Sequence, residues 1–168
     1  SGNVGFLSQS GGNTRELILV GAQRGISFSK AVSYGNAIDL DETDFLEYFT
    51  HDRDTKIVAA YVEGIKRPRS FLEVLKEATR TKPVVILKGG KTEAGTRAVM
   101  SHTNSLAGSR RVWDALCSQA GAIQVGDLAE MADTVLAFSD LRPPRGKRIG
   151  IVGIGGGASV QAADDCEK

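Results

Sequence analysis

The sequence KIVAAYV at residues 56–62 is almost wholly apolar, and PVVIL at residues 83–87 repeats that pattern. Between them lies a run with apolar residues at helical spacing, which begins at Pro68, a residue that the first turn of a helix tolerates. Strands of a parallel sheet that is covered on both faces are continuously apolar. The stretch therefore predicts two buried parallel strands joined by a crossover helix.

The same alternation of short apolar runs and amphipathic runs extends to both sides of this stretch. Further strands are predicted at residues 3–7, 26–32 and 122–125, and further helices at residues 14–23, 44–49, 109–119 and 128–138. Strands that alternate with helices favour an α/β fold with a parallel sheet. We expect residues 1–140 to form a doubly wound parallel sheet of the flavodoxin-like type.

The C-terminal part begins with LRPPRGK at residues 141–147, whose prolines, glycine and basic residues predict a linker. An apolar run at residues 148–154 predicts a new strand, and Gly155, Gly156 and Gly157 lead from it into a helix that begins at Ala158. One strand and one helix cannot bury a hydrophobic core by themselves. We therefore expect residues 148–168 to be the truncated start of a second, flavodoxin-like domain.

The composition excludes several classes of protein. Lys and Arg total 21 and Asp and Glu total 20, and this net charge of +1 argues against a nucleic-acid-binding surface. No apolar run approaches the roughly 18 residues of a membrane span and no secretory leader is visible, so we expect a cytoplasmic protein. Cys117 and Cys166 are isolated from each other and from any histidine, which predicts reduced thiols and no zinc or other metal site.

A glycine-containing turn follows the first predicted strand, and it consists of Gln9, Ser10, Gly11 and Gly12. Glycines let the backbone approach an anion closely, and the amides and dipole at the start of a helix attract phosphate. The turn is therefore a candidate phosphate-binding segment. The alternative is a tight turn of the kind that any α/β fold needs.

A carboxylate, Glu63, comes directly after the apolar strand at residues 56–62. In open α/β sheets, ligands bind at the edge formed by the carboxyl ends of the strands. Glu63 is therefore a candidate site residue, and the alternative is a solvated loop residue.

The segment at residues 88–108 is a loop-like stretch of roughly 20 residues, and loops of that length inside a compact domain are usually functional or disordered. It contains His102, which is surrounded by small hydrogen-bonding side chains. A histidine is a competent nucleophile when a carboxylate fixes its tautomer, and Glu63 comes from the neighbouring strand end. These residues, together with a phosphate-binding turn, favour a phosphorylated histidine, whereas His51 lies in a charged connection and is interpreted as exposed and non-functional.

Five motifs of the chain resemble those of the NDP-forming acyl-CoA synthetases, the superfamily of succinyl-CoA synthetase. They are SQSGG at residues 8–12, SYGN at 33–36, YVEG at 61–64, KPVVILKGG at 82–90 and SHTNSLAG at 101–108. They occur in the order that the family has, and together they extend over most of the chain. The chain departs from the family at Asn104, where the family usually has Gly, and at Ile154, where it more often has Ser or Asn.

The resemblance implies a reversible reaction in which an acyl-CoA, phosphate and ADP give an acid, CoA and ATP. It implies that His102 is phosphorylated during turnover and that Glu63 orients it. The family would use Gln9 to Gly12 to open one phosphate-stabilising helix, and Gly155 to Gly157 to open a second one. The loop would carry the histidine to a separate site where ADP becomes ATP.

The resemblance also implies partners that this chain does not contain. These are a CoA-binding Rossmann domain and an ATP-grasp domain, either in the same protein or in a partner subunit. CoA and ADP or ATP with magnesium would be substrates bound through those domains, together with a small-molecule acid, and no cofactor would be tightly bound. We therefore expect the fragment to be inactive alone. The alternative is a regulatory, acyl-CoA-sensing module fused to a protein acetyltransferase.

Overall fold

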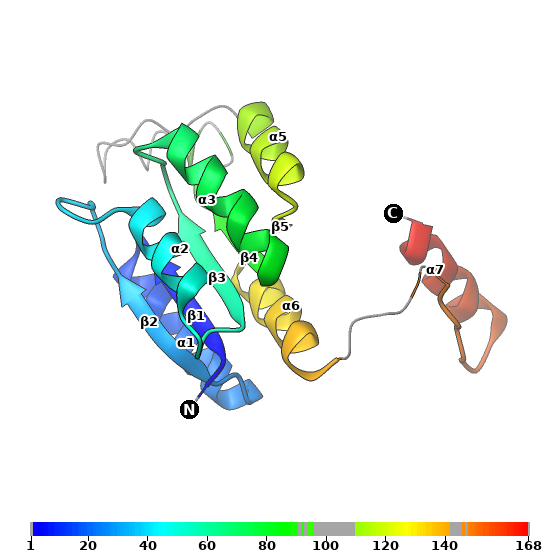
Figure 1. Cartoon of the computed structure of the whole chain (residues 1–168). Coiled ribbons are helices and arrows are strands. Elements are labelled where there is room, and N and C mark those ends of the chain that lie inside the picture. The colour runs from blue at the N-terminus through cyan, green and yellow to red at the C-terminus, as the bar shows by residue number, and fades with distance from the viewer. Residues whose placement is uncertain are drawn as a thin grey trace.

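Five parallel strands form one sheet in the order β2-β1-β3-β4-β5 (Figure 1). The computed structural model describes residues 2–90, 92, 94–95, 110–141, 146 and 148–167. The strands are β1 (Val4–Ser8), β2 (Phe28–Ser33), β3 (Ile57–Val62), β4 (Val84–Lys88) and β5 (Ile123–Val125). This order is that of the flavodoxin-like doubly wound fold. The predicted fold class is therefore confirmed.

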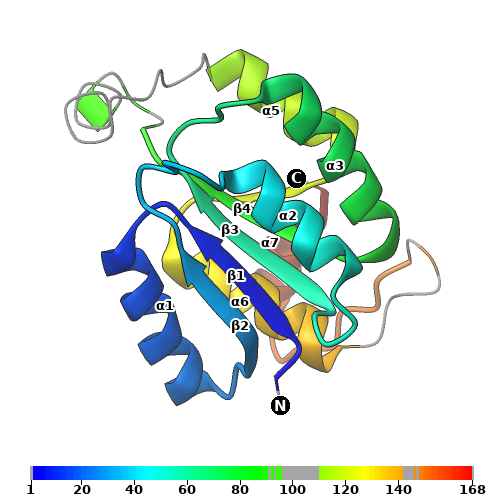
Figure 2. The same cartoon turned by 60° about the vertical axis from the view of Figure 1, so that its left-hand side comes forward.

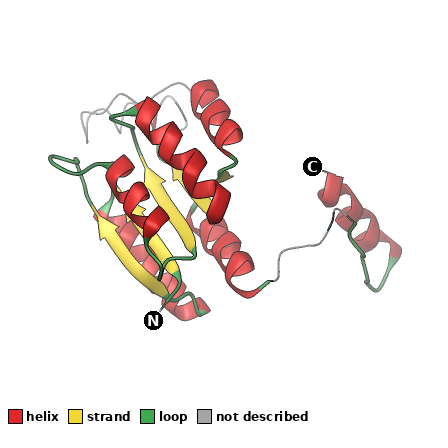
Figure 3. Ribbon diagram, in the orientation of Figure 1, coloured by secondary structure: helices red, strands yellow, loops and turns green. Residues whose placement is uncertain are grey.

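Helices cover both faces of this sheet (Figures 2 and 3). The described helices are α1 (Gly11–Arg24), α2 (Glu42–His51), α3 (Pro68–Thr81), α5 (Arg110–Ala120), α6 (Leu128–Asp140) and α7 (Gly156–Glu167). Helices α2, α3 and α5 contribute to the core on one face, and α1 and α6 contribute to the core on the other. No described helix is both long and apolar enough to cross a membrane.

The continuously apolar strands supply both cores, because successive side chains of a strand point to opposite faces. In β1, Phe6 packs into the core with α1 and α6, whereas Leu7 packs into the core with α2 and α3. Gly5 of the same strand lies directly beneath α2, since a Cβ atom there would lie 2.6 Å from the ring of Phe49. The sheet and its helices are thus in close contact at the strand that leads into the glycine-containing turn.

Helix caps set where two of the helices begin. Helix α1 begins at Gly11, three residues before the predicted start, because Ser10 is its N-cap and accepts a hydrogen bond from the backbone N–H of Asn13. Helix α2 begins after Asp41, which forms a capping box with Asp44. Apolar periodicity missed both first turns, since their residues are mostly polar or glycine.

The predicted strand at residues 148–154 is wrong. Residues 148–153 form no strand in the structure, and α7 begins at Gly156 rather than at Ala158. No residue of α7 is buried, and the apolar side chains of Val152 and Ile154 are fully exposed. A strand needs a neighbour that pairs with its backbone groups, and no described strand lies alongside these residues. The division into a domain at 1–140, a linker at 141–147 and a second domain at 148–168 stays a prediction.

Candidate functional site

A hollow of about 410 Å³ lies where the carboxyl ends of β1 and β3 meet the start of α1. The two strands are paired and parallel, so the segments that follow them emerge at the same edge of the sheet. Its lining consists of Gln9, Ser10, Gly11, Gly12, Gly35, Asn36 and Glu63. The structure thus brings the four residues of the predicted phosphate-binding turn together with the predicted carboxylate.

The turn at the start of α1 is fixed by its own hydrogen bonds. Ser10 Oγ accepts from Asn13 N at 3.2 Å, and Ser8 Oγ donates to the carbonyl oxygen of Ser10 at 2.9 Å. The first turn of a helix leaves backbone N–H groups without intrahelical acceptors, and the helix dipole places positive charge there. The amides of Gly11 and Gly12 therefore supply hydrogen-bond donors that favour an anion in the hollow.

Gln9 has a second role that its sequence position did not indicate. Its side-chain oxygen accepts hydrogen bonds from the backbone N–H groups of Glu63 and of Gly64, the latter at 3.0 Å. Its own backbone N–H donates to the carbonyl oxygen of Tyr61 at 3.0 Å. The side chain of Gln9 therefore ties the turn after β1 to the end of β3.

The carboxylate of Glu63 is held from one side only. The hydroxyl of Tyr61 donates to Oε1 at 3.0 Å, while Oε2 is buried and accepts no hydrogen bond from the described residues. Burial and then the negative charge of Glu63 raise the pKa of Tyr61 to about 12, so its hydroxyl keeps its proton at neutral pH. The backbone is held as well, since Lys88 Nζ donates to the carbonyl oxygen of Glu63 at 2.6 Å.

The loops that follow β2 and β3 are joined beside the hollow. Arg67 donates to both carboxylate oxygens of Asp41, at 2.7 and 2.8 Å. Although burial opposes ionisation of Asp41, these bonds outweigh it and hold the pKa of that carboxyl below its ordinary value. In addition, Lys66 donates its backbone N–H to the buried Glu42 at 2.6 Å and its ammonium to the carbonyl oxygen of Ala37. The segments that carry Asn36 and Glu63 are therefore fixed relative to each other.

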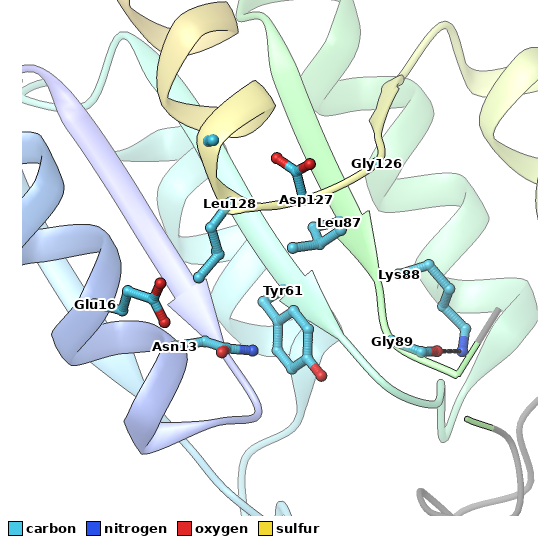
Figure 4. Close-up of a pocket in the computed structure, with 10 residues that line it drawn as sticks. Asn13, Glu16, Tyr61, Leu87, Lys88, Gly89, Gly126, Asp127 and Leu128 are labelled. Carbon is cyan, nitrogen blue, oxygen red and sulfur yellow. Dashed lines mark hydrogen bonds between the residues drawn. The ribbon is translucent and has the colours of Figure 1, made fainter. Parts of the chain in front are cut away.

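A second hollow, of about 470 Å³, lies at the same edge of the sheet and includes Tyr61 in its wall (Figure 4). Its lining consists of Asn13, Glu16, Tyr61, Leu87, Lys88, Gly89, Gly126, Asp127, Leu128 and Ala129. Figure 4 shows the amide of Asn13 pointing toward Tyr61. Tyr61 lines this hollow and Glu63 lines the first one, so the hydrogen bond between them links the walls of the two hollows.

The other predicted site residues are not brought to this hollow. His102 lies outside the described residues. Gly155, Gly156 and Gly157 are exposed at the start of α7, and the part of the chain that the structure describes places none of them in the lining of the first hollow. Their role stays a prediction. His51 is exposed and lies 3.7 Å from Glu77, in agreement with its interpretation as a surface residue.

Sequence reasoning missed Tyr61 and Lys88 as residues of the site. A signal was present for Tyr61, because residues two apart on a strand share a face and Tyr61 stands two residues before Glu63. The contact of Lys88 with Glu63 offered no such signal, since it depends on the pairing of β3 with β4.

Comparisons with known proteins agree with this fold and with the motif resemblance. The family described as "Succinyl-CoA ligase like flavodoxin domain" matches residues 1–138. The alpha subunit of acetate–CoA ligase (ADP-forming) II from Pyrococcus furiosus is 42% identical over 99% of this chain and 36% of its own length. The acetate–CoA ligase (ADP-forming) of Methanocaldococcus jannaschii is 42% identical over 98% of this chain and 23% of its own length.

A solved structure supports the same assignment. The dinucleotide-forming acetyl-coenzyme A synthetase 1 of Ca. Korarchaeum cryptofilum, in complex with phosphate and ADP, superposes with a TM-score of 0.91 at 38% identity. The match covers 98% of this chain and 36% of that one. The chain thus spans about a third or less of the length of these relatives. Because the family match covers residues 1–138 and the sheet has the matching topology, the chain belongs to the succinyl-CoA ligase like flavodoxin domain family.

Proposed function

We propose that this chain is the phosphohistidine domain of an ADP-forming acyl-CoA synthetase. In this reaction, phosphate attacks the thioester carbonyl of an acyl-CoA and expels CoA as a thiolate, which leaves an acyl phosphate. An imidazole nitrogen of His102 then attacks the phosphorus atom and releases the acid. Finally an oxygen of the β-phosphate of ADP attacks phosphohistidine, which gives ATP and regenerates the free imidazole.

The observation that carries this proposal is the pairing of helix-terminal donors with a carboxylate in one hollow. The amides at Gly11 and Gly12 favour the phosphoryl group, whereas Glu63 would repel a bare phosphate. A phosphorylated imidazole resolves this conflict, since its phosphoryl group meets the amides and its remaining N–H donates to the carboxylate. Glu63 thereby fixes the tautomer, so that the other ring nitrogen attacks phosphorus.

The greater length of the relatives supports the part of the proposal that concerns the other substrate sites. The relatives are about three to four times longer than the match, which leaves room for further domains. In this proposal a CoA-binding Rossmann domain and an ATP-grasp domain, in the same protein or a partner subunit, supply the other substrate sites. CoA, ADP and magnesium are bound through those domains, and a small acid is the product. The chain alone then carries the phosphoryl group but does not complete a turnover.

The test uses the intact parent protein, with its partner subunit if it has one, incubated with γ-³²P-ATP and magnesium. We expect a label that is stable in alkali and lost in acid, and that is absent from His102→Ala. Glu63→Ala is expected to slow labelling by about a hundredfold or more, as for loss of a general acid–base partner. His51→Ala is the matched control, because His51 is exposed at the end of α2 and lines neither hollow, and it should label like the wild type.

A labelled residue other than His102 would contradict the proposal. An unlabelled parent protein that still binds acyl-CoA would instead favour the regulatory module, and an acetyltransferase domain in the same reading frame would support that outcome.

A further inference from the structure

The geometry around Glu63 identifies a residue with a role that neither the motifs nor the comparisons assign. Glu63 follows the end of β3, where a loop carboxylate would ordinarily be free to rotate and to be solvated. Its backbone is held on both sides, by the side-chain oxygen of Gln9 at its N–H and by Lys88 Nζ at its carbonyl oxygen. The backbone of Glu63 is therefore fixed, and only the direction of its side chain remains to be set.

Tyr61 sets that direction. Its hydroxyl donates to Oε1 of Glu63 at 3.0 Å, and none of the other hydrogen bonds among the described residues reaches either carboxylate oxygen. A hydrogen bond to one oxygen of a carboxylate orients the group, since the two oxygens are joined by a planar carbon. As a result Oε2 is left as the acceptor, and it is buried and unpartnered among the described residues.

The glycine that follows β4 leaves room for this pair. A Cβ atom at Gly89 would lie 2.6 Å from the hydroxyl of Tyr61 and 3.1 Å from Cγ of Glu63. Gly89 does not have a positive φ, so its backbone conformation would also be open to other residues. Close approach of the Tyr61–Glu63 pair is therefore the reason why the position lacks a side chain.

We propose that Tyr61 is a positioning residue of the phosphoryl-transfer site: its hydroxyl orients the Glu63 carboxylate and leaves Oε2 as the acceptor for the N–H of the imidazole that is phosphorylated. This inference rests on the proposed function, since it acts on the same histidine. Tyr61 itself does not touch the reacting atoms. It acts through Glu63, and its contribution disappears when the Glu63 carboxylate is removed.

The experiment is a double-mutant cycle in the intact parent protein, with labelling by γ-³²P-ATP and magnesium followed over hours, so that slow variants are still measured. The variants are Tyr61→Phe, Glu63→Ala and the combination of the two. Tyr48→Phe is the matched control, because Tyr48 is half-exposed on α2 and its hydroxyl does not contact Glu63. Thermal unfolding of Tyr61→Phe shows whether the ring still packs in place.

We expect Tyr61→Phe to slow labelling of His102 about tenfold, as for loss of a hydrogen bond to a charged group, with unchanged thermal unfolding and an unchanged half-saturating ATP concentration. In the Glu63→Ala background the same substitution should slow labelling less than twofold, since interacting residues are not additive. Tyr48→Phe should label like the wild type.

Two results would overturn the inference while leaving the proposed function intact. One is a Tyr61→Phe protein that labels at the wild-type rate while Glu63→Ala is slow. The other is a tenfold loss from Tyr61→Phe in both backgrounds, which would show that the tyrosine acts independently of Glu63. A wild-type protein without label on His102 would overturn the proposed function, and this inference with it.

Discussion

The turns at residues 9–12 and 155–157 both follow an apolar run and both lead into a helix, yet their surroundings differ. The first follows β1, which pairs with β2 and β3 and is buried along its whole length. The second follows residues 148–153, which form no strand, and every described residue from 148 to 157 is exposed. The first turn lines a hollow together with residues from other strand ends, and residues 155–157 are not part of that lining.

The difference shows that a glycine-rich turn becomes a candidate site through its place in a sheet. Pairing of β1 with β3 brings Gln9 to the backbone of Glu63, although the two residues are 54 positions apart along the chain. Helix α7 has a similar start but lacks such neighbours among the described residues. Substitutions in the sheet and its helices should therefore differ in effect from matched substitutions at residues 148–167.

The largest difference in stability is expected for substitutions of apolar side chains in β1 and in residues 148–154. Phe6 of β1 is fully buried, so Phe6→Ala should lower the free energy of unfolding by about 3–5 kcal/mol. Val152 is fully exposed, and Val152→Ala should change it by less than about 0.5 kcal/mol. Urea unfolding of the 168-residue chain measures both. Similar losses at the two positions would mean that residues 148–154 are buried in solution.

The next largest difference in stability is expected for glycine-to-alanine substitutions in the two regions. A Cβ at Gly5 would lie 2.6 Å from the buried ring of Phe49, so Gly5→Ala should cost about 1–3 kcal/mol through overpacking. Gly156 has open space around it and begins α7, so Gly156→Ala should leave the unfolding midpoint unchanged or raise it slightly. A neutral Gly5→Ala would contradict the close packing of α2 on β1.

A smaller difference is expected at the helix starts. Ser10 caps α1 through a 3.2 Å hydrogen bond from Asn13 N, so Ser10→Ala should cost about 1 kcal/mol. Ser159, in the first turn of α7, is partly exposed and its hydroxyl bonds to the carbonyl oxygen of Gly155 just before the helix, so Ser159→Ala should be nearly neutral. Urea unfolding measures both effects. Equal losses of stability would show that the side chain of Ser10 does not stabilise its helix start more than that of Ser159 does.

The smallest expected effect is on the stability of the fold at acidic pH. The hydrogen bond from Lys30 on β2, followed by that from Thr55, lowers the pKa of Asp52 from its ordinary 3.8 to about 2. A carboxyl that is more acidic in the folded state stabilises it above pH of about 4, and this contribution is lost as the pH falls toward about 2. Asp52→Asn should therefore flatten the decline of the urea midpoint over that range.

Asp164→Asn, an exposed substitution in α7, is the control for this acid effect and should decline like the wild type. A wild-type midpoint that stays constant between pH of about 4 and about 2 would show that the Lys30–Asp52 pair is not formed in solution.

The sequence predicted all five strands of the sheet and the helices that cover it, to within a few residues, because the strands are short continuous apolar runs and the helices have apolar residues at helical spacing. It failed at residues 148–154, where an apolar run alone cannot show whether a partner strand is present. It also placed Gln9 in the phosphate-binding turn without indicating that its side chain bonds to the end of β3.

What the sequence by itself determined is the fold class, the family resemblance and the types of residue available for chemistry. Local periodicity and motif spacing suffice for these, since they depend on neighbours along the chain. What only the tertiary structure decided is how Glu63 is held: by Gln9 after β1, Tyr61 on β3 and Lys88 on β4. Those contacts depend on strand order and register, which place distant residues side by side and which no local pattern specifies.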